Sequence, residues 1–282
     1  MLIHGDCLDV MREMDANSVD AIITDPPYYK VKGEAWDNQW DTPAKFLAWV
    51  GLLCEQFERI LKPNGSLYFF ASPQMAARVE CEISKRFAVL NSITWRKGAA
   101  GKSSVGWSQK TEKEALRMWL PETERIIFAE PRGEFGSPLG DAIRTARVRA
   151  GLRGADVDVV LGYVRSKDPT RGTELCRRWE EGSSIPTADD YTRALKACGD
   201  PREYEDLRRE YEELRRPFNV TARDQWSDVW DFNPVQAYPG KHPCEKPLPL
   251  LCHILKASTK PGAVVFDPFA GSGSMGEACH EL

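Results

Sequence analysis

Short apolar runs alternate with segments of helical apolar spacing along the first part of the chain. The run at 19–23 is rich in β-branched residues and precedes two prolines, which predicts a buried strand with Asp25 at or just past its carboxyl end. Residues 42–61 carry apolar residues at helical spacing behind a threonine N-cap and a proline, which predicts a helix. The sequence KPNG at 62–65 is predicted to stop that helix and to turn the chain into a strand at 66–72.

The alternation of helix and strand continues beyond this point. A predicted helix around 75–87 is followed by a predicted strand at 89–95, and 124–130 is a further strand candidate. Near the end of the sequence, the apolar run AVVF at 263–266 leads into a glycine-rich turn and the start of a helix. Alternating strands and helices predict an α/β fold, with a mostly parallel sheet covered by helices on both faces.

The segment from 133 to 216 differs, because strand signals fade and the sequence becomes arginine-rich and helical. Residues 144–178 hold nine Lys/Arg against four Asp/Glu, whereas residues 179–216 hold seven against eleven. The end of this segment, EYEDLRREYEELRR, is typical of a solvated helix with opposite charges at three- and four-residue spacing. The chain therefore divides into 1–132 and 217–282, which share the α/β pattern, and a helical insertion at 133–216 for which a purely structural role stays open.

Composition and charge narrow the class of protein. The 282 residues are 42% hydrophobic, which is enough to bury a large core, and the formal net charge of −4 does not indicate nucleic-acid binding. No apolar run approaches the roughly 20 residues that cross a bilayer, and the N-terminus lacks a signal-peptide pattern, so we expect a cytoplasmic protein without a membrane partner. The eight cysteines form no CxxC pair, which favours reduced thiols over a disulfide framework or a metal site.

The glycine-rich turn FDPFAGSGSMG, at 266–276, is a candidate ligand site. Gly271 and Gly273 let the backbone turn tightly and approach a ligand, and a helix N-terminus supplies free N–H groups. Open α/β sheets bind nucleotides at such a turn, at the carboxyl end of a strand. A tight turn without a ligand is the alternative, and the spacing does not complete the dinucleotide fingerprint GxGxxG.

The sequence Thr24-Asp25-Pro26-Pro27-Tyr28 carries a more specific signal. Two prolines after an acid remove two backbone donors and fix the chain, which leaves carbonyl acceptors pointing outward. The carboxylate and the carbonyl of the first proline make an acceptor-only site suited to an exocyclic amine, and the tyrosine offers a face on which a planar base can stack. A proline-rich turn is the alternative, which the preceding strand and the second motif disfavour.

TDPPY together with the later FDPFAGSG resembles the amino-group DNA methyltransferases that use S-adenosylmethionine. The order of the two motifs is similar to that of the circularly permuted β class, in which the target-recognition region lies between them. LIHGDC at 2–7 resembles the opening strand and acidic turn of that class, ILKPNGSLYFF at 60–70 the strand after the catalytic helix, and HPCEKPLPLLCHIL at 242–255 the segment before the cofactor strand. The resemblance implies an α/β fold with a Rossmann-like, circularly permuted methyltransferase sheet and a helical recognition insertion.

The same resemblance implies roles for individual residues. The catalytic residues that hold the target base would be Asp25, Pro26, Pro27 and Tyr28. The cofactor would be bound by Asp6, Cys7, Asp25, His242, Lys246, Asp267, Phe269, Gly271 and Gly273. For Lys246, a surface lysine beside a rigid proline is the alternative. Because a sulfonium methyl is already activated, the chemistry requires no metal and no protein nucleophile.

The implied activity is transfer of a methyl group from S-adenosylmethionine to the N6 amine of adenine in double-stranded DNA, with the base flipped out of the helix. Residues 1–132 would form the catalytic half, 133–216 the target-recognition insertion and 217–282 the cofactor-binding half. Cytosine-N4 methylation and a DNA-binding protein that has lost catalysis are the alternatives. A homodimer and a cognate restriction enzyme are further expectations for the partners.

The insertion has a resemblance of its own. CRRWEEGSSIPTADDYTRALKACG, at 176–199, resembles the second half of a repressor-type helix-turn-helix domain, with 143–151 and 155–164 as the first two helices. Residues 165–172 would then be a loop longer than the tight turn of that family. The resemblance implies that Thr173, Glu174, Arg177 and Arg178 face the major groove of DNA.

The sequence after the glycine-rich turn leads to one more expectation. In the methyltransferase family, this turn leads into a full helix and then a strand whose terminal acid binds the cofactor ribose. Only SMGEACHEL follows Gly273, and the acids Glu277 and Glu281 would lie on the helix, poorly placed for the ribose. We therefore expect the 282-residue chain to bind S-adenosylmethionine weakly or not at all unless it is extended or completed.

Overall fold

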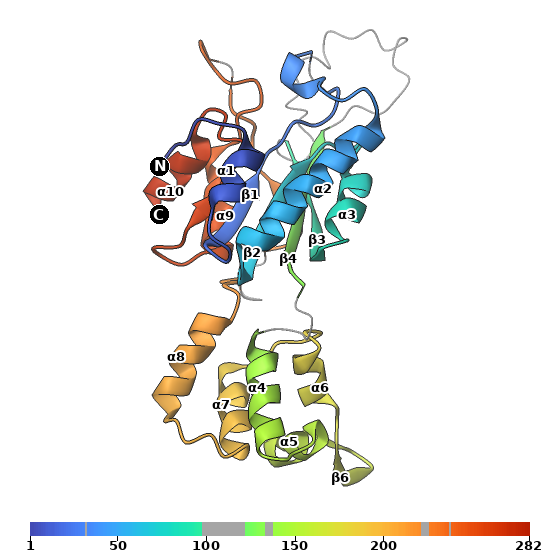
Figure 1. Ribbon diagram of the computed structural model, residues 1–282, viewed down its shortest axis with the longest axis vertical. Coiled ribbons are helices and arrows are strands. Elements are labelled where there is room, and N and C mark those ends of the chain that lie inside the picture. Colours follow the sequence, from blue (N-terminus) through green and yellow to red (C-terminus); the bar gives the residue numbers. More distant parts are fainter. Residues whose placement is uncertain (32, 98–121, 133–137, 221–225, 237) are drawn as a thin grey trace. The chain divides into compact units, whose positions relative to one another are not determined.

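The computed structural model describes residues 1–31, 33–97, 122–132, 138–220, 226–236 and 238–282 (Figure 1). The chain forms two compact units, one made of 1–131 with 217–282 and the other of 132–216. Each unit contains a hydrophobic core of its own. The first unit holds the main sheet, and the second is mainly helical.

The strands of the first unit are β1 (Val19–Thr24), β2 (Leu61–Ala71), β3 (Phe87–Arg96), β4 (Thr123–Pro131), β7 (Val229–Asp231) and β8 (Val265–Phe266). They form one sheet in the order β7-β3-β4-β2-β1-β8. β1 pairs in parallel with β2 and β8, and β3 pairs in parallel with β7, whereas β4 is antiparallel to β2 and β3. Among the described strands of this sheet only β4 is therefore reversed, which confirms the prediction of a mostly parallel sheet.

Helices cover both faces of this sheet: α1 (Cys7–Glu13), α2 (Pro43–Ile60) and α3 (Ala76–Ile83) on one face, and α9 (Leu248–Ser258) and α10 (Ser274–Glu281) on the other (Figure 1). Alternation along β2 explains the two layers, because successive side chains of a strand point to opposite faces. Leu67 and Phe69 pack into the core on the α2 side, and Tyr68 and Phe70 pack into the core on the α9 side.

The start of α2 follows the prediction, whereas the predicted turn after it is wrong. The Thr42 hydroxyl accepts the N–H of Lys45 at 3.3 Å, and a proline takes the first helical position. β2 begins at Leu61, directly after the helix, and 62–65 form an irregularity in its register with β1. A Cβ at Gly65 would lie 2.6 Å from the side chain of Leu61, so glycine permits this irregularity.

The predicted opening strand near the N-terminus is also wrong. Residues 1–6 form neither strand nor helix, and Leu2 and Ile3 are exposed. An extended apolar segment becomes a strand only where another strand supplies backbone partners, and the apolar pattern alone does not provide them. Asp6 instead caps α1, accepting the N–H of Leu8 at 2.9 Å.

The described part of the second unit consists of α4 (Pro138–Arg149), α5 (Gly154–Leu161), α6 (Leu175–Glu180), α7 (Ala188–Ala197), α8 (Tyr204–Leu214) and a hairpin of β5 (Val164–Arg165) and β6 (Asp168–Gly172). The hairpin occupies most of the segment predicted as a loop at 165–172. A Cβ at Gly172 would lie 2.6 Å from Asp158 Cβ and 2.7 Å from the carbonyl oxygen of Ala155. Only glycine therefore lets β6 pass so close to α5, and this contact depends on tertiary packing that the polar sequence of the hairpin does not reveal.

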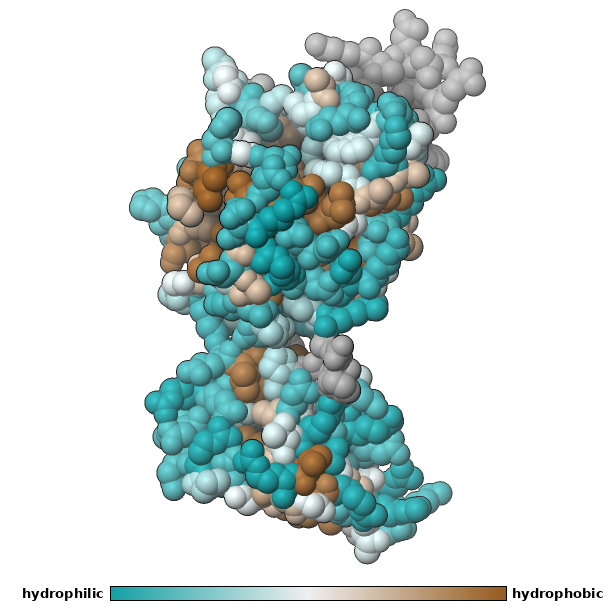
Figure 2. All heavy atoms as spheres, viewed as in Figure 1, coloured by the Kyte–Doolittle hydropathy of each residue, from teal (hydrophilic) through white to brown (hydrophobic). Residues whose placement is uncertain are grey.

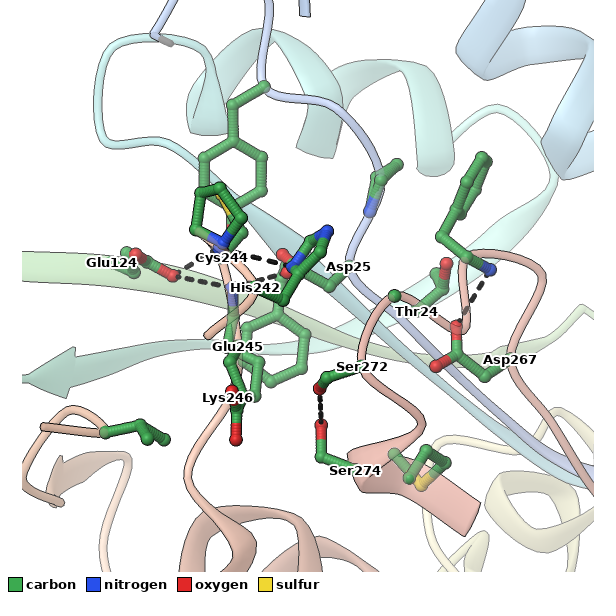
Figure 3. Close-up of a pocket in the computed structure, with 18 of the residues that line it drawn as sticks. Thr24, Asp25, Glu124, His242, Cys244, Glu245, Lys246, Asp267, Ser272 and Ser274 are labelled. Carbon is green, nitrogen blue, oxygen red and sulfur yellow. Dashed lines mark hydrogen bonds and ion pairs between the residues drawn. The ribbon is translucent and has the colours of Figure 1, made fainter. Parts of the chain in front are cut away.

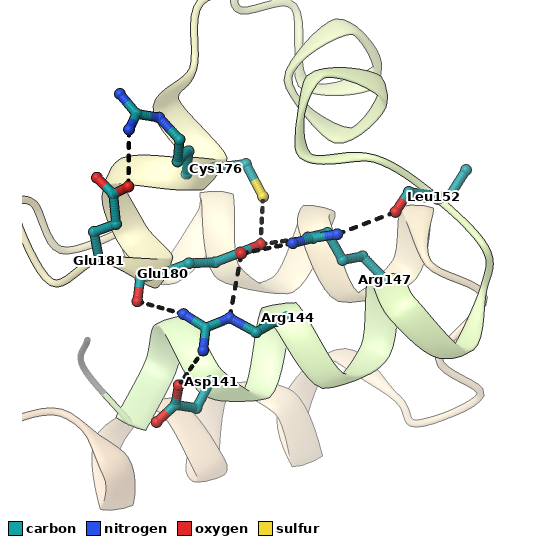
Figure 4. Close-up of polar contacts among 8 residues, drawn as sticks. Asp141, Arg144, Arg147, Leu152, Cys176, Glu180 and Glu181 are labelled. Atoms are coloured by element: carbon teal, nitrogen blue, oxygen red, sulfur yellow. Dashed lines mark hydrogen bonds and ion pairs between the residues drawn. The ribbon is translucent and has the colours of Figure 1, made fainter. Parts of the chain in front are cut away.

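Buried charge joins α4 to α6 in this unit (Figure 4). The Glu180 carboxylate, 8% exposed, accepts from Arg147 Nη2 at 2.7 Å and from Arg144 Nε at 3.3 Å. Arg144 also donates to the carbonyl oxygen of Glu180 at 2.8 Å. The helix pair thus depends on one acid that compensates two partly buried arginines.

Hydrophilic side chains predominate on the molecular face drawn in Figure 2. None of the described helices combines the length and the apolar character that a membrane span needs.

Candidate active site

A cavity of about 450 Å³ lies in the first unit, where segments far apart in the sequence meet (Figure 3). Its walls come from the DPPY loop after β1, the ends of β2 and β3, the start of β4, the segment before α9, and the turn between β8 and α10. Parallel strands bring their carboxyl ends to one edge of a sheet, where ligands bind in open α/β proteins. Because β4 runs the other way, its first residues reach that same edge. The volume falls in the range of small-molecule sites.

Most of the predicted site residues meet at this cavity. Those that line it are Asp25, Pro26, Pro27, Tyr28, His242, Lys246, Asp267, Phe269 and Gly271. Asp6, Cys7 and Gly273 lie outside the lining: Asp6 caps α1, Cys7 packs against the core, and Gly273 is the N-cap of α10 between two serines that do line the cavity.

A buried aspartate that belongs to no sequence motif holds the DPPY loop in place. The Asp37 carboxylate accepts the N–H groups of Tyr28 and Val31, each at 2.6 Å, and the residue is fully buried. Tyr29 and Lys30, which lie between those donors, have φ angles of 67° and 58°. Such angles are unfavourable for residues with a side chain, so the two hydrogen bonds stabilise a strained turn.

Three charged side chains, Asp25, Glu124 and Lys246, meet in the wall of the cavity. Lys246 Nζ lies 2.5 Å from Asp25 Oδ2 and 3.5 Å from Glu124 Oε2. The Tyr28 hydroxyl donates to Glu124 Oε2 at 2.9 Å, and Lys97 forms a further ion pair with this carboxylate. Asp25 Oδ1 is buried and has no hydrogen-bond partner within the described structure. A buried acceptor without a partner suits a ligand that donates a hydrogen bond.

Burial and charge shift the pKa values of these groups in different directions. Burial raises the pKa of Asp25, and the Lys246 ammonium opposes that rise. Burial also acts to raise the pKa of Glu124, but the ammonium groups of Lys246 and Lys97 outweigh it and hold this pKa low. For Lys246, burial acts to lower the pKa, and the two carboxylates raise it above its ordinary value. Burial raises the pKa of Tyr28, so its hydroxyl stays a hydrogen-bond donor.

The turn after β8 forms another part of the cavity, and in Figure 3 Asp267 and Glu124 lie on opposite sides of Asp25. Burial raises the pKa of Asp267 to about 7, although the N–H of Phe269 donates to Oδ1 at 3.0 Å and acts against the rise. Gly271 has a φ of +52°, and a Cβ there would lie 3.5 Å from the ring of His242. The turn therefore passes close to that ring, and together with the first residues of α10 it could hold a cofactor.

Glu124 and Asp37 are functional candidates without a sequence motif. Glu124 is the second residue of β4, a largely apolar strand that is buried on both faces. An acidic residue in such a strand is the only feature of the sequence that could have indicated its role. Asp37 lies in a short 3-10 helix, η1 (Ala35–Asp37), within a polar loop. Their roles become visible only when the strand order and the loop path are known.

A largely parallel α/β sheet, with an acidic loop and a glycine-rich turn sharing one cavity at its strand ends, is the arrangement of ligand-binding α/β proteins of the Rossmann-like class. Residues 19–282 match the model of the DNA methylase family, and the chain belongs to that family.

Two relatives and one solved structure illustrate the similarity. The DNA adenine methyltransferase YhdJ of Escherichia coli (strain K12) is 26% identical over 286 residues, covering 98% of this chain and 72% of the relative. The type II methyltransferase M2.DpnII of Streptococcus pneumoniae is 22% identical over 303 residues, covering 100% of this chain and 81% of the relative. The structure of the PvuII DNA methyltransferase (cytosine-N4-specific) matches with a TM-score of 0.53 and 14% identity, covering 98% of this chain and 76% of that chain. This last likeness bears on the fold alone.

Proposed function

We propose that the protein transfers a methyl group from S-adenosylmethionine to the N6 amine of adenine in double-stranded DNA. The observation that carries the proposal is a single cavity that joins the DPPY loop, where Asp25 Oδ1 is unpaired, to the glycine-rich turn. Membership of the DNA methylase family supports it, as do the names of the two relatives, a DNA adenine methyltransferase and a type II methyltransferase.

The DPPY loop fits the target amine. An exocyclic amine has two N–H donors, and Asp25 Oδ1 and the Pro26 carbonyl would accept them, which favours a more tetrahedral and more nucleophilic nitrogen. As this nitrogen takes the methyl group, it must give up one of its two protons, and Asp25 Oδ1 would be the acceptor placed to receive it. The base must leave the duplex to reach this wall, and Pro27 and the ring of Tyr28 would support it there in place of its stacked neighbours.

The glycine-rich turn fits the cofactor. When bound, S-adenosylmethionine supplies an activated methyl group on a cationic sulfur. A buried carboxylate such as Asp267 suits a cationic ligand, and Gly271 lets the backbone approach without a side chain in the way. Phe269 and His242 would supply the apolar and aromatic contacts beside them, since both line the same cavity.

Product identity tests this proposal. Purified protein in a form that binds labelled S-adenosylmethionine should transfer the label to double-stranded DNA, and mass spectrometry of the nucleosides should find N6-methyladenine. If mass spectrometry finds N4-methylcytosine instead, the substrate is cytosine and not adenine. If the protein binds DNA but transfers no labelled methyl group, it is a DNA-binding protein that has lost catalysis.

We further propose that the chain belongs to the circularly permuted β class. In the sequence, the DPPY residues 25–28 precede the turn at 267–273, while both segments line one cavity. Residues 1–132 would then form the catalytic half, 217–282 the cofactor half and 133–216 the target-recognition insertion. A homodimer, a cognate restriction enzyme and a cytoplasmic location stay predictions.

Affinity for S-adenosylmethionine should fall as the pH drops below about 7. Burial raises the pKa of Asp267 to about 7, so this group becomes neutral below that pH and a carboxylate above it. A cationic cofactor favours the carboxylate, and binding should therefore release a proton near neutral pH. Calorimetry in two buffers of different ionisation enthalpy measures that release, and Asp267→Asn should abolish it. Equal affinity at about pH 6 and about pH 8 would contradict this role.

We propose that the second unit recognises DNA through α6, in the manner of a repressor-type helix-turn-helix domain. The order α4, α5, α6 supports this proposal, and so do the hydrogen bonds that hold the first residues of α6 in place. Asp158 of α5, which is buried, accepts the N–H groups of Leu175 and Cys176 at 3.0 and 2.7 Å. Thr173 precedes the helix, and Arg177 and Arg178 are exposed on it. The hairpin between α5 and α6 is a departure from the tight turn of that family.

Arg178→Gln should weaken DNA binding more than Arg177→Gln. Arg177 pairs with Glu174 at 3.1 Å and with Glu181 at 2.8 Å, whereas Arg178 forms no ion pair with another described residue. If Arg178 contacts a phosphate, its substitution should reduce the salt slope of DNA binding by about 1. If it contacts a base, its substitution should relax the base preference at one position of the target. DNA titrations at several salt concentrations measure both, with cofactor affinity as the control. Unchanged DNA binding in both variants would leave the unit a structural role.

A further inference from the structure

The described polar contacts of Lys246 lie inside the cavity wall. Its side chain is 8% exposed, and its ammonium is shared between the carboxylates of Asp25 and Glu124 at 2.5 and 3.5 Å. The ring centres of Tyr28, Phe70 and Trp95 lie 5.3, 5.2 and 5.9 Å from Nζ. Two carboxylates and three aromatic rings therefore surround the ammonium, so groups of the cavity wall already compensate its charge.

We propose that Lys246 is a positioning residue for Asp25. The Lys246 ammonium holds Oδ2 of Asp25 so that Oδ1 faces the substrate amine, and Glu124 anchors this ammonium. The inference rests on the proposed methyl transfer. A carboxylate that rotates freely presents its lone pairs in changing directions. One that is held through a short ion pair presents a single oxygen in a fixed direction, and Asp25 Oδ1 is the oxygen left without a partner.

Glu124 also gives the cluster a charge that suits the reaction. Asp25 and Lys246 together are electrically neutral, and a neutral pair offers little stabilisation to a nitrogen that gains positive charge during alkylation. Glu124 adds a second negative charge beside the pair. Lys97 also pairs with Glu124, but its side chain is 28% exposed, so solvent screens its charge more than that of Lys246.

Lys246 and Glu124 shift the pKa of Asp25 in opposite directions. Lys246 lowers the pKa of Asp25, and Glu124 raises it. The other titratable groups that act on Asp25 in the described structure include the hydroxyl of Tyr28 and the carboxyl of Asp267. Removing the ammonium should move the titration of Asp25 to higher pH, and removing the Glu124 charge should move it to lower pH.

Carbon-13 NMR of the carboxyl groups in the full chain tests the proposal without methyl transfer, with the Asp25 resonance assigned through Asp25→Asn. The midpoint should rise in Lys246→Met, fall in Glu124→Gln, and return toward wild type in Lys246→Arg. In assays with DNA, the pH at which kcat declines on the acid side of its profile should move in the same directions. At about pH 8, where Asp267 of the wild type is a carboxylate, Lys246→Met should lose about 10²-fold in kcat, and its affinity for S-adenosylmethionine should change far less.

An Asp25 titration that is unchanged in both Lys246→Met and Glu124→Gln would overturn the proposal. So would an unchanged titration in Lys246→Met combined with lost cofactor affinity, because Lys246 would then be a cofactor ligand. Glu124→Gln keeps the shape of the side chain, so it decides the question even if Lys246→Met fails to fold. If the variants shift the Asp25 titration as expected but wild-type protein methylates no DNA, the positioning of Asp25 is supported and the proposed function is refuted.

Discussion

Asp25→Ala should abolish methyl transfer to DNA while leaving S-adenosylmethionine binding largely intact. The substitution removes Oδ1, the buried acceptor without a partner, and leaves the turn at Asp267 unchanged. Loss of one preorganised hydrogen-bonding group costs about 10²–10³ in kcat. Here the loss should be greater, because the Lys246 ammonium is also freed from its 2.5 Å ion pair beside the substrate. Steady-state transfer of labelled methyl to DNA measures kcat, and calorimetry measures cofactor affinity.

Two matched variants sharpen this test. Asp25→Asn keeps the side-chain volume, but its amide oxygen should turn toward the Lys246 ammonium and its NH₂ group toward the substrate amine, so two donors would meet. This variant should therefore be nearly as inactive as alanine. Asp41→Asn removes a carboxylate that is 79% exposed and outside the cavity, and should have wild-type kcat. Asp25→Ala protein that retains more than about a tenth of wild-type turnover would refute the assigned role.

Features that are local in the sequence could be predicted. β1 is a short β-branched run ended by prolines, and α2 has its cap and its proline in adjacent positions. The DPPY loop and the glycine-rich turn are continuous motifs, so the residues they contribute to the cavity could be named in advance. Their meeting at one edge of the sheet follows from the parallel direction of β1 and β8, which the alternation of elements already implies.

Features that depend on pairing between distant segments could not be predicted. Glu124 reaches the site because β4 is antiparallel to both neighbours, and an apolar strand carries no mark of its direction. Asp37 matters because a loop folds back onto it. The hairpin at 164–172 exists because Gly172 fits against α5. Lys246 could be named from its motif, but its contact with Asp25, 221 positions away, becomes visible only in the folded chain.

Gly140→Ala should destabilise the second unit strongly. A Cβ at this position in α4 would lie 2.1 Å from the carbonyl oxygen of Trp179 and 2.9 Å from Glu180 Cα. These are backbone atoms, which cannot swing aside as the end of a flexible side chain can, so α4 must move away from α6. That movement would break the buried pairing of Glu180 with its arginines, and breaking such a pair costs about 3–5 kcal/mol. We expect the free energy of unfolding of the second unit to fall by about this amount.

Hydrogen exchange resolved along the chain measures this loss, and it should be confined to 138–216 within the described part of the second unit. Gly276→Ala is the matched control, because that glycine lies inside α10 with nothing within 4 Å of its Cβ. Alanine there should be neutral or stabilise by up to about 1 kcal/mol. If Gly140→Ala loses DNA binding but keeps cofactor affinity, DNA recognition depends on the second unit while the cofactor site in the first unit folds without it. Full DNA binding and methyl transfer by a variant whose second unit has unfolded would place target recognition in the first unit instead.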